Sequence, residues 1–242
     1  MALGNGHRRL LAMFARLADA RPFFVIAGPC VVESTAHCVQ IAKEIRAIGE
    51  RLGILVIFKA SCDKANRRRA DSFRGPGMGA GLEALRVVRE TVGIPVTTDV
   101  HEPAQVQAAA QVCDMLQIPS LLCRQTDLIS AAARSGRVVN IKKGQFATAD
   151  IMLDAASKAR MAAAEAVGQV AEGAGGGVLL TERGNSFGYD DLVVDPRNLV
   201  RLRNAGRGSG AGGESGTNSG RGVGSGVAGV GTVGDSGVVD NL

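Results

Sequence analysis

Short apolar runs alternate with longer amphipathic stretches through most of the chain. Runs this continuously rich in Val, Ile and Leu are typical of strands that a parallel sheet buries on both faces. They predict strands at residues 23–27, 54–60, 94–100, 115–119, 138–143 and 177–182. The stretches between them predict helices at residues 35–52, 79–92, 103–112, 126–136 and 149–172. Because strand and helix alternate, the pattern indicates an α/β fold built from βα units.

Polar side chains gather where the predicted strands end. They are Cys30, Lys59, Ser61, Asp99, His101, Gln117, Lys142, Lys143, Glu182 and Arg183. Groups at the carboxyl ends of many strands converge on one mouth only when the sheet curls into a barrel. A doubly wound sheet would instead place a glycine-rich GxGxxG loop after its first strand, and this sequence has none there. We therefore predict a (β/α)8 TIM-barrel.

Composition narrows the function classes. The net charge is only +5, and the chain has one Tyr and no Trp. A nucleic-acid-binding groove combines clustered cations with aromatic rings that stack on bases, so we do not expect this protein to bind nucleic acid. The five Cys form no CxxC pair, so neither a zinc knuckle nor a disulfide scaffold is indicated. Without a long apolar run or a signal sequence, we expect a cytoplasmic protein that does not bind membranes.

The lysines are scarce and unevenly placed. The chain has 22 Arg and only 6 Lys, and four of the lysines, Lys59, Lys64, Lys142 and Lys143, lie at or just beyond strand ends. Lysines there usually bind phosphate or carboxylate groups or form a Schiff base. Further cations are Arg67, Arg74, Arg124 and Arg183. Together they suit substrates that carry two phosphates and a carboxylate, with Asp99 as an ionised hydroxyl anchor or proton acceptor among them.

Seven ordered motifs carry a specific resemblance. They are residues 26–34 (IAGPCVVES), 58–67 (FKASCDKANR), 73–77 (FRGPG), 97–103 (TTDVHEP), 117–127 (QIPSLLCRQTD), 140–146 (NIKKGQF) and 181–195 (TERGNSFGYDDLVVD). From about residue 22 to 203 the chain resembles the 3-deoxy-D-manno-octulosonate 8-phosphate synthases. The related 3-deoxy-D-arabino-heptulosonate 7-phosphate synthases typically have KPRT where this chain has KANR at 64–67. A heptulosonate 7-phosphate synthase is therefore the alternative enzymatic function.

The resemblance implies a transferase of lipopolysaccharide biosynthesis that condenses phosphoenolpyruvate with D-arabinose 5-phosphate and water and releases phosphate. It implies a homotetramer in which Arg124 reaches the sugar phosphate across a subunit interface. By motif position, Asn66 and Arg67 resemble the other ligands of that sugar, and Asp99 the residue that steers its hydroxyls or a metal-bound water. The side chains that resemble the phosphoenolpyruvate pocket are Lys59, Ser61, Lys64, Gln117, Lys142 and Arg183.

Cys30 resembles the metal ligand of the metal-dependent branch of this family, whose other branch has Asn at that position. The resemblance therefore implies a divalent metal ion as cofactor, and a thiolate suits Mn, Zn or Fe among the ions in question. The family's other ligands, a His, a Glu and an Asp, come from two further βα units that this sequence does not show.

The resemblance stops near residue 203. We divide the chain into an N-terminal helical extension (1–21), a catalytic domain with the first six βα units of a barrel (22–203), and a Gly/Ser-rich tail (204–242). Fourteen glycines in those last 39 residues predict flexible coil. Our hypothesis is that the tail reads a shifted frame of a GC-rich gene, which resequencing would test. The non-enzymatic alternative is that the chain is a catalytically inactive, truncated product of the family.

Overall fold

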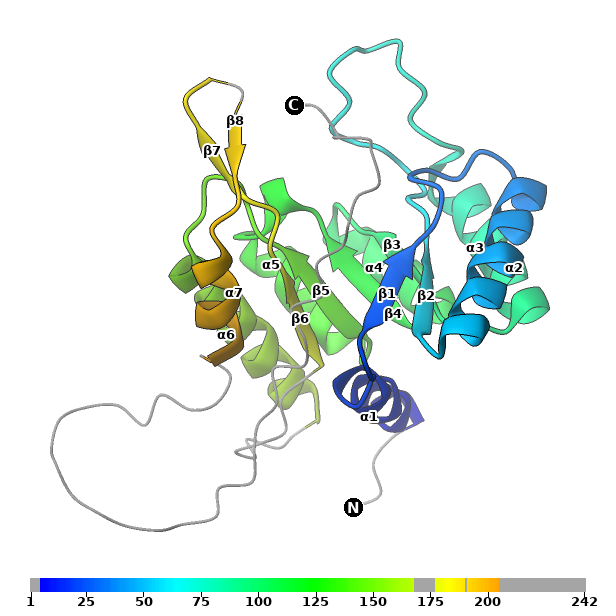
Figure 1. The fold of residues 1–242 in the computed structure, drawn as a ribbon, viewed down its shortest axis with the longest axis horizontal. Coiled ribbons are helices and arrows are strands. Elements are labelled where there is room, and N and C mark those ends of the chain that lie inside the picture. The colour runs from blue at the N-terminus through cyan, green and yellow to red at the C-terminus, as the bar shows by residue number, and fades with distance from the viewer. Residues whose placement is uncertain (1–4, 168–176, 190, 205–242) are drawn as a thin grey trace, which may run out of the picture.

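Figure 1 shows the computed structural model, which describes residues 5–167, 177–189 and 191–204. Six parallel strands form one sheet in the chain order β1-β2-β3-β4-β5-β6. They are β1 (Phe24–Ala27), β2 (Leu55–Lys59), β3 (Val96–Asp99), β4 (Met115–Ile118), β5 (Val138–Lys142) and β6 (Val178–Thr181). The six predicted strands are thus confirmed.

Helices connect the strands, as the sequence predicts. Those predicted between strands are α2 (Thr35–Leu52), α3 (Gly77–Val92), α4 (Pro103–Val112), α5 (Thr126–Arg134) and α6 (Ala149–Val167). The predicted N-terminal helix is α1 (Asn5–Ala18), whereas η1 (Ser120–Leu122) and α7 (Pro196–Asn204) were not predicted. The end of the helix predicted at 149–172 and all of the predicted tail beyond Asn204 lie outside the described residues. No helix in the described part of the chain is long and apolar enough to cross a bilayer.

The sheet curls but does not close within the described residues. There, β1 pairs in the sheet with β2 alone and β6 with β5 alone, so both strands are edges. Figure 1 shows these two edge strands facing each other across the curl. The arrangement confirms the prediction of a (β/α)8 barrel of which six βα units are present.

An antiparallel hairpin follows β6 and was not predicted. It consists of β7 (Asn185–Phe187) and β8 (Asp191–Val193). Figure 1 shows it projecting beyond the carboxyl end of the sheet. Gly188 takes a left-handed φ of 66° in its turn, a conformation that favours glycine. The Phe187 and Tyr189 side chains are exposed.

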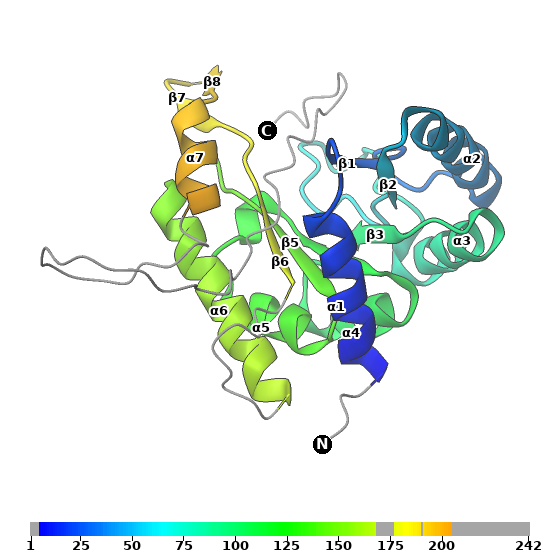
Figure 2. The same ribbon diagram turned by 60° about the horizontal axis from the view of Figure 1, so that its bottom comes forward.

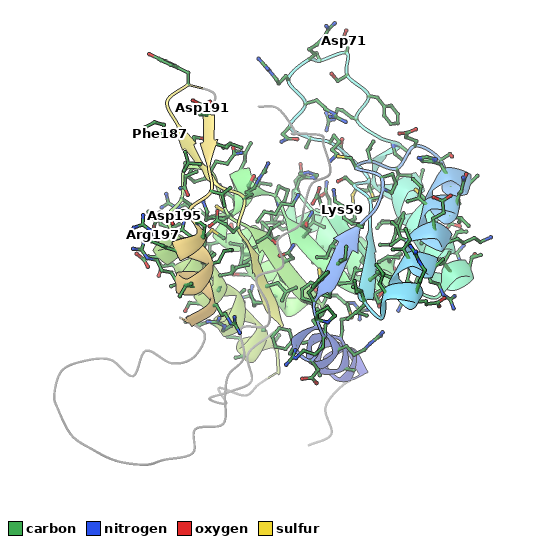
Figure 3. The ribbon with its side chains drawn as sticks, viewed as in Figure 1. Lys59, Asp71, Phe187, Asp191, Asp195 and Arg197 are labelled. Atoms are coloured by element: carbon green, nitrogen blue, oxygen red, sulfur yellow. The ribbon has the colours of Figure 1, made fainter. Side chains whose placement is uncertain are left out.

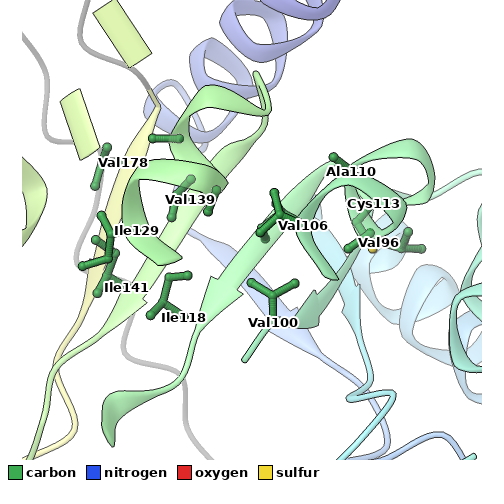
Figure 4. Close-up of a cluster of buried hydrophobic side chains, with 14 of the residues drawn as sticks. Val96, Val100, Val106, Ala110, Cys113, Ile118, Ile129, Val139, Ile141 and Val178 are labelled. Atoms are coloured by element: carbon green, nitrogen blue, oxygen red, sulfur yellow. The ribbon is translucent and has the colours of Figure 1, made fainter. Parts of the chain in front are cut away.

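The main core lies between the outer face of the sheet and the helices that cover it. Apolar side chains of β3 to β6 pack there against α4 and α5, as Figure 4 shows. Among them are Val96, Val106, Ala110, Ile118, Ile129, Val139, Ile141 and Val178. This burial, at about 25 cal/mol per Å² of apolar surface, anchors the strands that carry the polar groups.

A second core lies inside the curl at the amino ends of the strands. Met13 and Leu17 of α1 pack there against apolar strand residues that include Ile57, Met115 and Val138. Figure 2 shows α1 lying across this end of the sheet. Because α1 covers the amino ends, the carboxyl ends are the face left for a site.

Candidate active site

Asp99 lies at the centre of the polar groups at the carboxyl ends. It is the last residue of β3 and is buried. Its Oδ2 accepts a hydrogen bond of 2.6 Å from the Ser61 hydroxyl, and its Oδ1 accepts one from the Gln117 amide. The Lys59 ammonium lies 4.0 Å from Oδ2. Because β2, β3 and β4 are parallel neighbours, all four residues lie at the carboxyl end of the sheet.

Opposing effects set the charge of Asp99. Burial raises the pKa of its carboxyl, but the positive charges of Lys59 and Lys142 and the hydrogen bonds from Gln117 and Ser61 lower it by more. The pKa of Asp99 therefore lies well below its usual value. At neutral pH the site holds a buried carboxylate, which agrees with the prediction that Asp99 is ionised.

Two of the lysines predicted for the site, Lys59 and Lys142, lie close enough to lower the pKa of this carboxyl, and the third, Lys64, lies close to Lys59. Burial lowers the pKa of Lys59, Asp99 raises it, and the positive charges of Lys142 and Lys64 lower it further. Lys64 is buried, and Lys59 also donates to the Cys30 carbonyl at 3.4 Å. Figure 3 shows Lys59 at the carboxyl end of the sheet, inside the curl. The structure thus brings Lys59 and Lys142 close to Asp99, and Lys64 close to Lys59.

Two buried polar residues extend the site and were not predicted. The Asn140 amide donates to Gln117 Oε1 at 3.1 Å, and the Thr181 hydroxyl donates to Asn140 Oδ1 at 2.8 Å. Asn140 lies in the middle of β5, and Thr181 ends β6. A lone Asn inside an otherwise apolar strand was the signal that could have identified the first of them.

Arg183 lies just beyond β6, at the rim of the site. Its guanidinium donates to the Ser120 hydroxyl at 2.7 Å. The preceding Glu182 holds the turn, because its Oε1 accepts from the backbone N–H groups of Arg183 and Gly184 at 2.9 and 2.7 Å. This turn determines where the Arg183 side chain begins.

Lys143 does not belong with the other strand-end lysines. Its side chain is 0% exposed, and its ammonium donates to the carbonyls of Gly184, Ala147 and Gly144 at 2.7 to 3.3 Å. It also donates to Asn185 Oδ1 and lies 3.3 Å from Glu182 Oε1. The expectation that Lys143 binds a substrate anion is wrong, because the protein's own oxygens surround the ammonium.

The residues predicted for the sugar phosphate lie farther out. Asn66 is exposed, and the half-buried Arg67 donates to the Phe73 carbonyl at 3.3 Å. Arg124 is exposed too, and it lines a cavity of about 380 Å³ with residues of α6 such as Asp154 and Lys158. The roles of these three residues toward the sugar stay predictions.

Arg74 is bound elsewhere than in the predicted cation cluster. Its guanidinium makes two parallel hydrogen bonds to Asp63, at 2.9 and 2.5 Å. The Arg74 hydrogen bond and burial act on the pKa of Asp63 in opposite directions, and the net effect lowers it. Since this pair satisfies both charges, Arg74 ties the loop after β2 together. His101, after β3, has a buried Nδ1 without a partner among the described residues.

The described residues do not make up a metal site. Cys30 is half-buried, and no group of three His, Cys, Asp or Glu side chains in the described part of the chain could hold an ion. One thiolate does not meet the ligand requirement of a transition metal. The other four cysteines are buried thiols, and burial raises the pKa of Cys62 to about 11. No cysteine is in a disulfide.

The geometry can bind an anion that carries two charged groups. Lys59, Lys64 and Lys142 are buried or half-buried, and in such surroundings charge-assisted hydrogen bonds are about twice as strong as neutral ones. Asp99 is a negative charge beside Lys59 and Lys142, and its carboxylate can accept a hydrogen bond from a hydroxyl. Fixed charges of this kind are able to position and stabilise a charged ligand.

Comparison with known proteins gives one family. The family model described as "DAHP synthetase I family" matches residues 16–206. The chain is 47% identical over 193 residues to 2-dehydro-3-deoxyphosphooctonate aldolase 2 of Arabidopsis thaliana, covering 80% of this chain and 62% of that protein.

Two bacterial proteins named 2-dehydro-3-deoxyphosphooctonate aldolase show similar values. Over 185 residues the identity is 50% to the protein of Syntrophotalea carbinolica and 52% to that of Bordetella petrii. In both cases the match covers 76% of this chain and 63% of the relative. The chain therefore spans less than two thirds of the length of these relatives.

Proposed function

The chain belongs to the DAHP synthetase I family, and from that premise we propose that its half-barrel forms the phosphoenolpyruvate site of a 3-deoxy-D-manno-octulosonate 8-phosphate synthase. That enzyme is the 2-dehydro-3-deoxyphosphooctonate aldolase of the relatives' names, at 46 to 52% identity. The proposed reaction condenses phosphoenolpyruvate with D-arabinose 5-phosphate and water and releases phosphate. The relatives' names do not favour the heptulosonate 7-phosphate alternative.

The observation that carries the proposal is the lysine cluster around Asp99. Phosphoenolpyruvate has a phosphate and a carboxylate, so it needs several fixed cations in one place. Lys59, Lys64 and Lys142 supply them, and Arg183 extends the cluster at the rim. We assign Ser61 and Gln117 to the same pocket through their hydrogen bonds to Asp99.

In the proposed reaction C3 of the enol attacks the sugar aldehyde, water adds at C2, and the C2–O bond to phosphate breaks. The lysines hold the phosphate while it leaves, which stabilises the developing charge. Asp99, as an anion, accepts a hydrogen bond from a sugar hydroxyl and so orients the aldehyde toward C3. Asn66 and Arg67 are proposed ligands of the sugar, with Arg124 acting across a subunit interface of a homotetramer.

We propose that the whole enzyme binds a divalent ion, with Cys30 as one ligand. The ion would supply charge stabilisation or activate a water when bound. Because the described residues do not complete such a site, the roles above are given to the chain's own side chains. We also propose that the enzyme works in the cytoplasm.

Phosphate release from phosphoenolpyruvate tests this function. The purified chain is incubated with phosphoenolpyruvate and either arabinose 5-phosphate or erythrose 4-phosphate, with and without Mn²⁺ or Zn²⁺. We expect release that depends on arabinose 5-phosphate. Equal or faster release with erythrose 4-phosphate would contradict the proposed substrate, and release that needs no sugar would contradict the condensation.

A further inference from the structure

A chain of hydrogen bonds crosses the inside of the sheet from β6 to Asp99. It runs from the Thr181 hydroxyl to Asn140, from Asn140 to Gln117, and from Gln117 to Asp99. All four side chains belong to buried residues. Gln117 stands directly opposite Asp99 in the strand register, and Asn140 stands directly opposite Gln117. The parallel register therefore places Asp99, Gln117 and Asn140 side by side, whereas Thr181 pairs with Lys142 and reaches Asn140 diagonally.

The direction of every bond in this chain follows from the carboxylate at its end. An ionised Asp99 only accepts hydrogen bonds, so Gln117 must turn its NH2 group toward it. The oxygen of Gln117 then faces Asn140, which must donate to it. Asn140 Oδ1 then accepts a hydrogen bond from the Thr181 hydroxyl. With the amide of Gln117 reversed, its oxygen would face Asp99 Oδ1, and that oxygen would lose the hydrogen bond from Gln117 while Oδ2 kept the one from Ser61.

We propose that Asn140 and Thr181 are positioning residues that act on Asp99 through Gln117, by fixing the orientation of the Gln117 amide. The consequence of this role for catalysis rests on the proposed function, in which Asp99 orients the sugar. The fixing itself depends on four buried side chains and needs no substrate. Neighbouring hydrogen bonds of this kind polarise one another, so a donor removed at Thr181 weakens the bond that reaches Asp99.

Three substitutions separate this role from simple packing. Thr181→Val keeps the shape of the side chain but removes the hydroxyl, and Thr181→Ser keeps the hydroxyl as the matched control. Asn140→Asp keeps the size of the side chain but makes it an acceptor only, so the bond to Gln117 cannot form in its present direction. If the residues merely fill space, Asn140→Asp and Thr181→Val should leave the Gln117 amide unaffected.

The readout is the Gln117 side-chain amide in a ¹H–¹⁵N spectrum of the full chain, assigned with Gln117→Ala. In the unsubstituted protein we expect two well-separated Nε2 protons and slow exchange with water. Thr181→Val should shift both signals and speed exchange roughly 2- to 10-fold, the effect of losing one ordinary hydrogen bond. Asn140→Asp should do more, and Thr181→Ser should match the unsubstituted protein. Unchanged Gln117 signals in Thr181→Val and Asn140→Asp would overturn the proposal.

Turnover gives a second readout that keeps the two proposals apart. If the chain releases phosphate, Thr181→Val should lower kcat, and Thr181→Ser should leave kcat within about twofold of the unsubstituted protein. Changed Gln117 signals without any condensation would support the positioning role and refute the proposed reaction. A normal Gln117 spectrum would refute the positioning role at any level of turnover.

Discussion

Replacing Lys143 with Met should destabilise the protein more than any other lysine substitution outside the proposed site. Met fills nearly the same volume but removes the ammonium that joins the loop after β5 to the turn after β6. Four oxygens lose their donor, at distances of 2.7 to 3.3 Å. The Glu182 carboxylate, 2% exposed, loses its positive partner at 3.3 Å.

The magnitude follows mainly from Glu182. Removing one partner of a buried ion pair costs about 3–5 kcal/mol, because the other charge stays buried and uncompensated. Glu182 Oε2 already has no hydrogen-bond partner among the described residues, so nothing at that atom offsets the loss. A domain has a free energy of unfolding of about 5–15 kcal/mol, so the substitution would remove a large fraction of it.

Equilibrium unfolding in urea, followed by far-UV circular dichroism because the chain has no Trp, measures this cost. Lys43→Met on the exposed face of α2 is the matched control and should change the free energy of unfolding by less than about 0.5 kcal/mol. The double variant Lys143→Met, Glu182→Gln should be more stable than the sum of its single variants predicts, by about 0.5–3 kcal/mol. A cost below about 1 kcal/mol for Lys143→Met, or strictly additive single variants, would refute the reasoning.

Three further predictions concern charge, close packing and a helix start. The depressed pKa of Asp99 stabilises the fold above the usual carboxyl pKa, so the stability difference between the unsubstituted protein and Asp99→Asn should shrink below about pH 4; a difference that stays constant from pH 7 to pH 3 would contradict this. Gly28→Ala would drive its Cβ into the Lys59 carbonyl oxygen and should lower the melting temperature, whereas Gly79→Ala in α3 meets nothing within 4 Å and should raise it slightly; equal shifts would argue against the close approach. Ser34→Ala removes the hydroxyl that accepts from the His37 backbone N–H at the start of α2 and should cost about 0.5–2 kcal/mol in urea unfolding, while Ser34→Asp should retain most of the stability.

The strands were predictable because burial on both faces makes each a continuous apolar run, and this signal needs no tertiary information. The β7–β8 hairpin was not, because its exposed Phe187 and Leu192 lack the alternation of a half-buried strand. The helix starts shifted by only a few residues, as with α3, which begins at Gly77 instead of residue 79.

At the site, residue type and strand position together predicted the cluster around Asp99. They did not separate Lys142 from Lys143. Consecutive strand residues point to opposite sides of the sheet, but the sequence pattern did not show which of the two lysines points toward the site. Nor could they foresee that Arg74 is paired with Asp63, which lies eleven residues earlier in the chain. Asn140 and Thr181 escaped notice because their roles depend on neighbours across the sheet.

Calorimetric titration of phosphoenolpyruvate into the chain tests the central claim, that the lysines around Asp99 form its binding site. The account predicts saturable binding that Lys142→Met weakens roughly 10- to 150-fold, the effect of one lost charge-assisted hydrogen bond. Lys43→Met should bind as tightly as the unsubstituted protein. Binding of equal strength in Lys142→Met, or no binding by the unsubstituted chain, would contradict the account.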